Sequence, residues 1–211
     1  MKQFEIPEYY RSPIISHVKK LRKENDRRKK DFSPTRLKFD NVTFLISRHF
    51  GFCFGVENAI EIAYRAIDEN PNKNIFLLSE MIHNPVVNED LLQRGVKFIQ
   101  DTSGNPIIDI NTIKKEDIVL IPAFGSSTEI ENKLLEIGVN IKSYNTTCPF
   151  VEKVWKRSKN LGETNHTIII HGKKNHEESK ATFSRSNLNA PTLIIRDLKE
   201  AISLGEYIKE P

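Results

Sequence analysis

The sequence predicts an α/β protein in which parallel sheets are covered by helices. Short apolar stretches rich in β-branched residues, such as 42–46, 75–78 and 118–121, recur along the chain and are typical of buried strands. The segments between them carry apolar residues at helical spacing, so strands and helices alternate. This alternation is characteristic of parallel sheets with helices on both faces.

Composition places the chain among globular proteins. Its 211 residues are enough for one large or two small domains, and 38% of them are apolar. No apolar stretch is long enough to cross a bilayer, and the first residues lack the apolar core of a secretory signal. Because Cys53 and Cys148 are the only cysteines, a disulfide framework is excluded, and we expect a reducing cytoplasm.

The positive charge is concentrated near the amino terminus, in a segment that we expect to be a basic extension over 1–40. Residues 19–30 carry eight basic side chains against Glu24 and Asp26, whereas the net charge of the whole chain is only +4. We interpret this run as the solvated face of a short helix that has one apolar edge. The extension precedes an α/β domain over 41–147 and an incomplete second α/β domain over 148–211.

The first cysteine lies between a predicted buried strand at 42–46 and a predicted helix over 55–70. Gly51 and Gly55 permit the tight backbone that a strand-to-helix turn needs. The positive end of the following helix would stabilise a Cys53 thiolate, which suits metal ligation or nucleophilic attack. A buried structural thiol is the alternative.

The later elements follow from local signals. Pro85 and Gly95 mark the start and end of one helix. Ser126 and Glu129 form a capping box for a second helix, which Gly138 ends. The remaining strands are expected at 75–78, 96–99, 107–110, 118–121, 139–142, 167–170 and 191–195, and the remaining helices over 150–160, after a loop at 171–178 and over 197–204.

Chemistry-bearing residues recur at the carboxyl ends of these strands. Right-handed crossovers bring such ends to one edge of a sheet, where ligands bind. Two separate thiolates suit an iron–sulfur cluster better than magnesium or calcium, and the lack of a C-x-x-C pair argues against a zinc ribbon or a thioredoxin-like site. The residues that follow a strand and precede a helix are Cys53, His83, Phe124, Cys148 and His176.

The two loop histidines indicate an anion site. His83 and His176, together with several helix N-termini, could bind a diphosphate, although each could equally be structural. Glu177 and Glu178 follow His176 directly, and either could donate a proton in a low-dielectric site or be an ordinary acid of a first helical turn. Cys148, before Pro149, could likewise simply cap a helix.

Five motifs in order resemble those of the 4-hydroxy-3-methylbut-2-enyl diphosphate reductase family, in its longer plant- and cyanobacterium-like branch. They are Gly51-Phe52-Cys53-Phe54-Gly55-Val56, Ile82-His83-Asn84-Pro85, Thr146-Thr147-Cys148-Pro149-Phe150-Val151, His171-Gly172-Lys173 and His176-Glu177-Glu178. The resemblance covers the chain from about residue 43 to its end. Each motif alone is weak, but their order and spacing are specific.

The resemblance implies an iron–sulfur oxidoreductase of isoprenoid biosynthesis, with three similar α/β domains around a [4Fe–4S] cluster. The family reduces 4-hydroxy-3-methylbut-2-enyl diphosphate to isopentenyl and dimethylallyl diphosphate with electrons from an external donor of the ferredoxin or flavodoxin type. By motif match, Cys53 and Cys148 would be cluster ligands and His83 and His176 would bind the diphosphate. Glu178 would be the catalytic acid of the proton relay.

Two departures from the family pattern matter. Phe124 stands where many members have a third diphosphate-binding histidine, and the family's third cysteine would lie beyond residue 211. We therefore expect a fragment that is inactive alone. A non-catalytic binding module that docks through residues 19–30 on nucleic acid or a partner is the alternative, and a zinc hydrolase using both cysteines and a histidine is a third reading.

Overall fold

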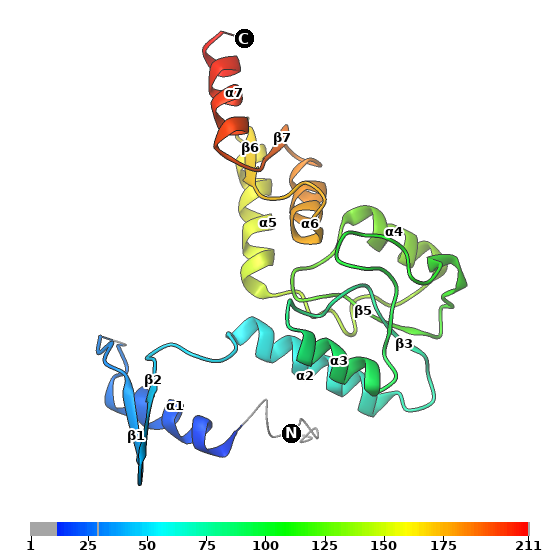
Figure 1. Ribbon diagram of the computed structural model, residues 1–211. Helices are drawn as coiled ribbons and strands as arrows, with labels where there is room; N and C mark the ends of the chain where they lie inside the picture. The colour runs from blue at the N-terminus through cyan, green and yellow to red at the C-terminus, as the bar shows by residue number, and fades with distance from the viewer. Residues whose placement is uncertain (1–11, 29, 211) are drawn as a thin grey trace. The chain divides into compact units, whose positions relative to one another are not determined.

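The computed structural model describes residues 12–28 and 30–210, and its contacts divide the chain into two compact units. The first unit is Met1–Cys53 and the second is Phe54–Pro211 (Figure 1). We describe each unit by itself.

Within residues 12–28 and 30–53, the first unit contains one helix and one hairpin. Helix α1 (Pro13–Asn25) begins at Ser12, whose hydroxyl accepts a hydrogen bond from the Ile15 amide, and this confirms the predicted short helix. Strands β1 (Thr35–Phe39) and β2 (Val42–Ile46) pair antiparallel.

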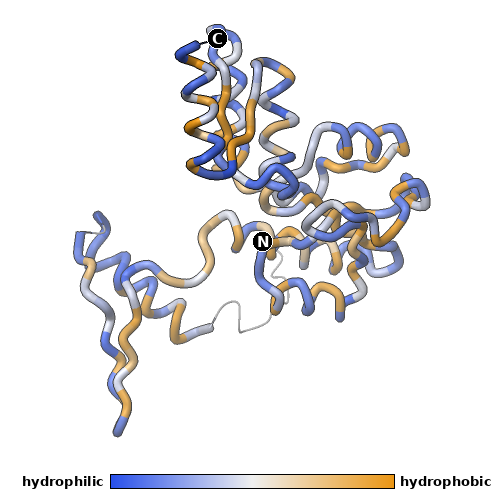
Figure 2. Tube along the Cα trace, turned by 45° about the horizontal axis from the view of Figure 1, so that its top comes forward, coloured by the Kyte–Doolittle hydropathy of each residue, from blue (hydrophilic) through white to orange (hydrophobic). Residues whose placement is uncertain are grey.

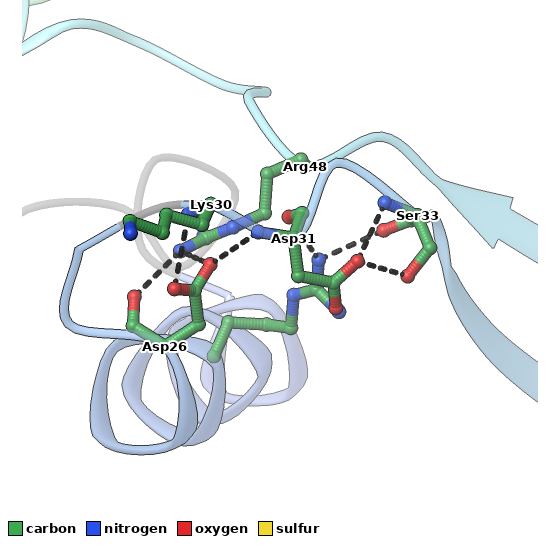
Figure 3. Close-up of polar contacts among 6 residues, drawn as sticks. Asp26, Lys30, Asp31, Ser33 and Arg48 are labelled. Carbon is green, nitrogen blue, oxygen red and sulfur yellow. Dashed lines mark hydrogen bonds and ion pairs between the residues drawn. The ribbon is translucent and has the colours of Figure 1, made fainter.

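An aspartate at the end of α1 organises the segment that leads to the hairpin (Figure 3). The Asp26 carboxylate accepts hydrogen bonds from the backbone amides of Lys30 and Asp31 at 3.0 and 2.9 Å. Arg48 donates to the Asp26 carbonyl oxygen at 3.2 Å and lies 3.5 Å from its carboxylate. These amides, more than the arginine, lower the pKa of Asp26 below its ordinary value of 3.8, because they stabilise the ionised form.

The basic segment is only partly solvated. Arg22 is half-buried and donates to the Asp31 carboxylate and to the carbonyl oxygens of Asp31 and Ser33. Lys20 and Lys23 of the same helix are exposed, as the interpretation of a solvated face requires.

The expectation of a buried strand at 42–46 was wrong. These residues do form strand β2, but its partner is the antiparallel β1 and not a parallel sheet. Phe44 and Leu45 are 55% and 60% exposed. An apolar β-branched run specifies an extended backbone, whereas its partner and its burial depend on contacts far along the chain. Cys53 therefore follows a hairpin strand and a loop, directly before a helix.

The second unit opens with a parallel sheet of three strands, and the predicted fold class is confirmed. Strands β3 (Ile75–Leu77), β4 (Lys97–Phe98) and β5 (Ile118–Leu120) are ordered β4–β3–β5. Helices α2 (Phe54–Glu69) and α3 (Pro85–Gln93) lie on one side of this sheet, and α4 (Thr128–Ile137) lies on the other (Figure 1).

The core follows the alternation of side chains along these strands. Phe76 and Val119 point into a cluster with Leu134 of α4, whereas Leu77 and Leu120 alternate with them and are also fully buried. Apolar residues line the strands and recur along the helices between hydrophilic ones (Figure 2). Both faces of the sheet are thus buried, as predicted for a parallel sheet.

A second, two-stranded parallel sheet follows. It consists of β6 (Ile168–His171) and β7 (Thr192–Ile195), accompanied by helices α5 (Pro149–Gly162), α6 (Glu177–Ser186) and α7 (Leu198–Lys209). The expectation that all strand ends share one sheet edge was therefore wrong, because β6 belongs to a different sheet from β3. The predicted domain boundaries after residues 40 and 147 stay predictions.

Several local predictions failed. Residues 107–110 are not a strand but lead into a short 3₁₀ helix, η2 (Ile110–Thr112), and residues 139–142 are turn and loop. Ser127 caps α4 in place of Ser126. By contrast, Asn84 caps α3 before Pro85, and Gly138 ends α4 with a left-handed φ of 92°, as their types predict. Across the residues that the structure describes, no helix is both long and apolar enough to span a membrane.

Candidate functional site

The structure brings the two predicted diphosphate-binding histidines together. The ring centroids of His83 and His176 lie 5.0 Å apart, with the rings at 62°. His83 is exposed and lies in the loop between β3 and α3, whereas His176 is half-buried and precedes α6. The Glu80 carboxylate lies 3.4 Å from Nδ1 of His83, so Nε2 is the ring nitrogen left over for a ligand.

His176 also begins a helix. It is the N-cap residue of α6, and its Nδ1 accepts a hydrogen bond from the Glu178 amide at 3.3 Å. Because that nitrogen accepts, the neutral ring carries its proton on Nε2. A donor is thus fixed at the N-terminus of a helix, where anions are stabilised.

The two acids after His176 occupy different environments. Glu178 is exposed, and its backbone amide makes the contact just described. Glu177 is buried, and its carboxylate accepts hydrogen bonds from the Ser79 hydroxyl and, at 2.7 Å, from the Gln100 amide. Burial raises the pKa of Glu177 above its ordinary value of 4.5, against the opposite effects of Ser79, Gln100, His83 and Lys180.

Phe124 stacks on the His83 ring. Its ring is 5.4 Å from that of His83 at an angle of 10°, and it is buried. Gly125 follows with a φ of +82°, and a β-carbon there would lie 2.3 Å from the Trp155 ring. The Arg185 guanidinium stacks on the same Trp155 ring, 4.0 Å from its centroid, and forms an ion pair with Glu131.

Cys148 lies beside the same turn. Its backbone amide donates to the carbonyl oxygen of Ala123 at 2.7 Å, so it is adjacent to the segment that carries Phe124. Cys148 is the N-cap residue of α5, and its side chain makes no capping hydrogen bond. Its sulfur packs on the first turn of α2, where a β-carbon on Gly55 would lie 2.3 Å away.

The described residues do not by themselves fit a three-cysteine cluster. Both cysteines are free thiols, but among residues 12–28 and 30–210 no group of three His, Cys, Asp or Glu side chains could hold a metal ion. Cys53 is exposed and ends the first unit. The buried Thr147 hydroxyl, next to Cys148, has no hydrogen-bond partner within this described part.

Three features of the site were not predicted. They are the stacking of Phe124 on His83, the approach of Gly55 to Cys148 and the burial of Glu177 in place of Glu178. Only the last had a usable signal. Glu177 lies four residues before the buried Ala181 and so on the same face of α6.

Comparison with known sequences gives a consistent result. The family model described as LytB protein matches residues 44–209. A 4-hydroxy-3-methylbut-2-enyl diphosphate reductase of Prochlorococcus marinus (strain AS9601) is 37% identical over 96% of this chain and 46% of its own length. The protein of the same name from Nostoc sp. (strain PCC 7120) is 40% identical over 80% of this chain and 40% of its own length.

Solved structures of reductases are also similar to this chain. A structure of (E)-4-hydroxy-3-methyl-but-2-enyl diphosphate reductase, the terminal enzyme of the non-mevalonate pathway, matches with a TM-score of 0.60 and 28% identity over 76% of this chain and 52% of the other. A Plasmodium falciparum reductase matches with a TM-score of 0.61 and 26% identity over 72% of this chain and 44% of the other.

The chain spans about half the length of these relatives, and the matched region includes both cysteines and both site histidines. Since the family model covers most of the sequence, from residue 44 to residue 209, this chain belongs to the LytB protein family.

Proposed function

We propose that this chain supplies the diphosphate-binding side and two cluster cysteines of a 4-hydroxy-3-methylbut-2-enyl diphosphate reductase. The observation that carries the proposal is the pairing of His83 and His176, whose rings lie 5.0 Å apart at a helix N-terminus. The two relatives described above, which carry this name, are 37% and 40% identical to the chain.

The diphosphate would bind by charge and by hydrogen bonds. Nε2 of His176 is a donor, Nε2 of His83 faces no partner within residues 30–210, and the first turn of α6 adds its dipole. Phe124 cannot donate a hydrogen bond, so its contribution would be to hold the His83 ring by stacking.

The reaction of the whole enzyme would consume two electrons and two protons. The allylic C–O bond breaks, the hydroxyl group leaves as water, and a C–H bond forms to give isopentenyl or dimethylallyl diphosphate. Glu178 is exposed next to His176 and would deliver a proton in this relay. The electrons would come from an external ferredoxin- or flavodoxin-type donor, and two free thiols favour a reducing, cytoplasmic setting.

Diphosphate binding can be tested on the 211-residue chain with inorganic pyrophosphate and isothermal calorimetry. His83→Ala and His176→Ala should each weaken binding by about tenfold, since each removes a charged or charge-assisted hydrogen bond. His166→Ala is the matched control, because His166 is an exposed histidine that contacts Thr164 away from α6. Equal affinity in all four proteins would refute the assignment.

The cysteine ligands require a separate test. Cys53 precedes Gly55 by two residues, a tether of about 7 Å at most, and Gly55 packs on the Cys148 sulfur. The proposal requires the two sulfurs to approach each other. Mild oxidation should then form an intramolecular disulfide, seen by mass spectrometry as the loss of two hydrogen atoms, and Cys148→Ser should prevent it. If the wild-type chain forms only intermolecular disulfides, the two sulfurs do not approach each other in the free chain.

A further inference from the structure

A buried carboxylate connects the two segments that carry the site histidines. Glu177, 7% exposed, lies in the first turn of α6, directly after His176. Its carboxylate accepts a hydrogen bond from Ser79, which opens the loop of His83, and another from Gln100, which follows β4. One side chain thus joins the start of α6 to the carboxyl ends of two strands of the other sheet.

The loop that carries His83 is fixed on its other side as well. Asn88 of α3 donates to the carbonyl oxygen of Ile82 at 2.9 Å and accepts from the amide of Met81 at 3.0 Å. The Met81 carbonyl in turn accepts from the Ala123 amide at 3.1 Å. Other hydrogen bonds join α6 to Thr128 and Ser103, and the one between Glu177 and Ser79 is the link that reaches the segment carrying His83.

Burial of this carboxylate has a cost that a purely structural contact would avoid. Burying an ionised group is unfavourable, and an apolar side chain would fill the same space without that cost. Here two hydrogen bonds and the nearby His83 and Lys180 offset part of the cost. Unlike an apolar side chain, a carboxylate makes directional contacts, because its two oxygens accept separate hydrogen bonds from Ser79 and Gln100.

We propose that Glu177 is a positioning residue for the diphosphate, which sets the spacing of the His83 and His176 rings through its hydrogen bond to Ser79. The residue acts through the two histidines and does not touch the ligand. This inference rests on the proposed diphosphate site, and it assigns Glu177 a role distinct from the proton relay of Glu178.

The test uses the 211-residue chain, inorganic pyrophosphate and two readouts. The first is the affinity by calorimetry, and the second is the nuclear Overhauser effect between the His83 and His176 ring protons without ligand. Glu177→Leu should lose the ring contact and weaken binding by about tenfold, because neither hydrogen bond survives. Glu177→Gln should restore both readouts, since an amide can accept from Gln100 and donate to Ser79. Ser79→Ala, which removes one partner and no bulk, keeps the test open if the leucine variant fails to fold.

Ser158→Ala is the matched control. It removes a buried hydrogen bond of 2.6 Å between Ser158 and Ser186 on the opposite side of α6, so it should lower stability and leave both readouts unchanged. The proposal is overturned if Glu177→Leu and Ser79→Ala keep the ring contact and the affinity, or if Ser158→Ala loses them equally. Should wild-type protein bind no pyrophosphate, the proposed function fails, while the ring contact in the variants still decides the positioning role.

Discussion

The first turn of helix α2 approaches Cys148 so closely that a β-carbon on Gly55 would lie 2.3 Å from the sulfur and 3.1 Å from the cysteine's own β-carbon. Gly55 has an ordinary helical backbone, so the requirement for glycine here comes from space and not from φ. Gly55 lies two residues after Cys53, the other cysteine of the chain.

Replacing Gly55 with alanine should lower the free energy of unfolding by about 1–3 kcal/mol, because the new methyl group must displace Cys148. Urea unfolding followed by circular dichroism measures the change. Gly205→Ala is the matched control, since Gly205 lies in helix α7 with no atom within 4 Å of the added carbon. That change should raise stability by up to about 1 kcal/mol. Equal effects of the two substitutions would mean that the α2 contact is not tight.

Gly125→Ala should be more harmful, because it combines two penalties. A φ of +82° costs a non-glycine residue about 1–2 kcal/mol, and the methyl group would meet the Trp155 ring at 2.3 Å. Gly95→Ala separates the two effects, since Gly95 has a φ of +88° with nothing within 4 Å of its added carbon. The difference between the variants, measured by urea unfolding, should be about 1–3 kcal/mol. A difference near zero would show that the Trp155 ring moves away from the added methyl group at little energetic cost.

The pH dependence of stability should change in Glu177→Gln. Burial raises the pKa of Glu177 in the folded chain above 4.5. Below that value the carboxyl is protonated in both states, so no stability is lost. As pH rises, the unfolded chain ionises first, and stability falls until pH passes the folded pKa. Because glutamine does not titrate, the stability of the variant relative to wild type should increase as pH rises above 4.5 and level off once pH passes the folded pKa, as urea unfolding at several pH values would measure. A constant difference would contradict the raised pKa.

Acid should have the opposite effect at Asp26 in the first unit. Backbone amides of Asp31 and Lys30 lower the pKa of Asp26 below 3.8 in the folded chain. The carboxylate therefore stabilises the α1–β1 connection above pH 3.8, and this stability is lost as pH falls through the folded pKa. The protection factors of the Lys30 and Asp31 amides, which correct for the slower intrinsic exchange in acid, should be high at neutral pH and lower at acid pH. Asp26→Asn should show faster exchange already at neutral pH, and unchanged protection in that variant would rule out the carboxylate's role.

Elements with local boundary signals could be predicted from the sequence. Helix α3 begins and ends where Asn84, Pro85 and Gly95 indicate, because caps and glycine turns depend only on neighbouring residues. The convergence of His83 and His176 was also correctly expected, although the geometric reason was wrong. Their strands belong to different sheets, and the rings meet where Glu177 of α6 accepts a hydrogen bond from Ser79, in the segment that follows β3.

The predictions that failed depend on contacts between residues far apart in the sequence. Strand β2 has the composition of a core strand but pairs with β1, and no local property of 42–46 reveals that choice. Glu177 and Glu178 have the same chemistry, but one residue along a helix turns a side chain by about 100°, which separates a buried carboxylate from an exposed one. The closeness of Gly55 to Cys148 depends on how two helices pack, and residue spacing does not encode it.

The cap at His176 has a consequence for which molecules the site can accept. Because Nδ1 is engaged by the Glu178 amide, the neutral ring presents a proton to visitors and no lone pair. Amines, guanidines and other solutes rich in N–H groups find nothing on this imidazole to bind. The start of α6 therefore favours molecules that accept hydrogen bonds over molecules that donate them, whatever their shape.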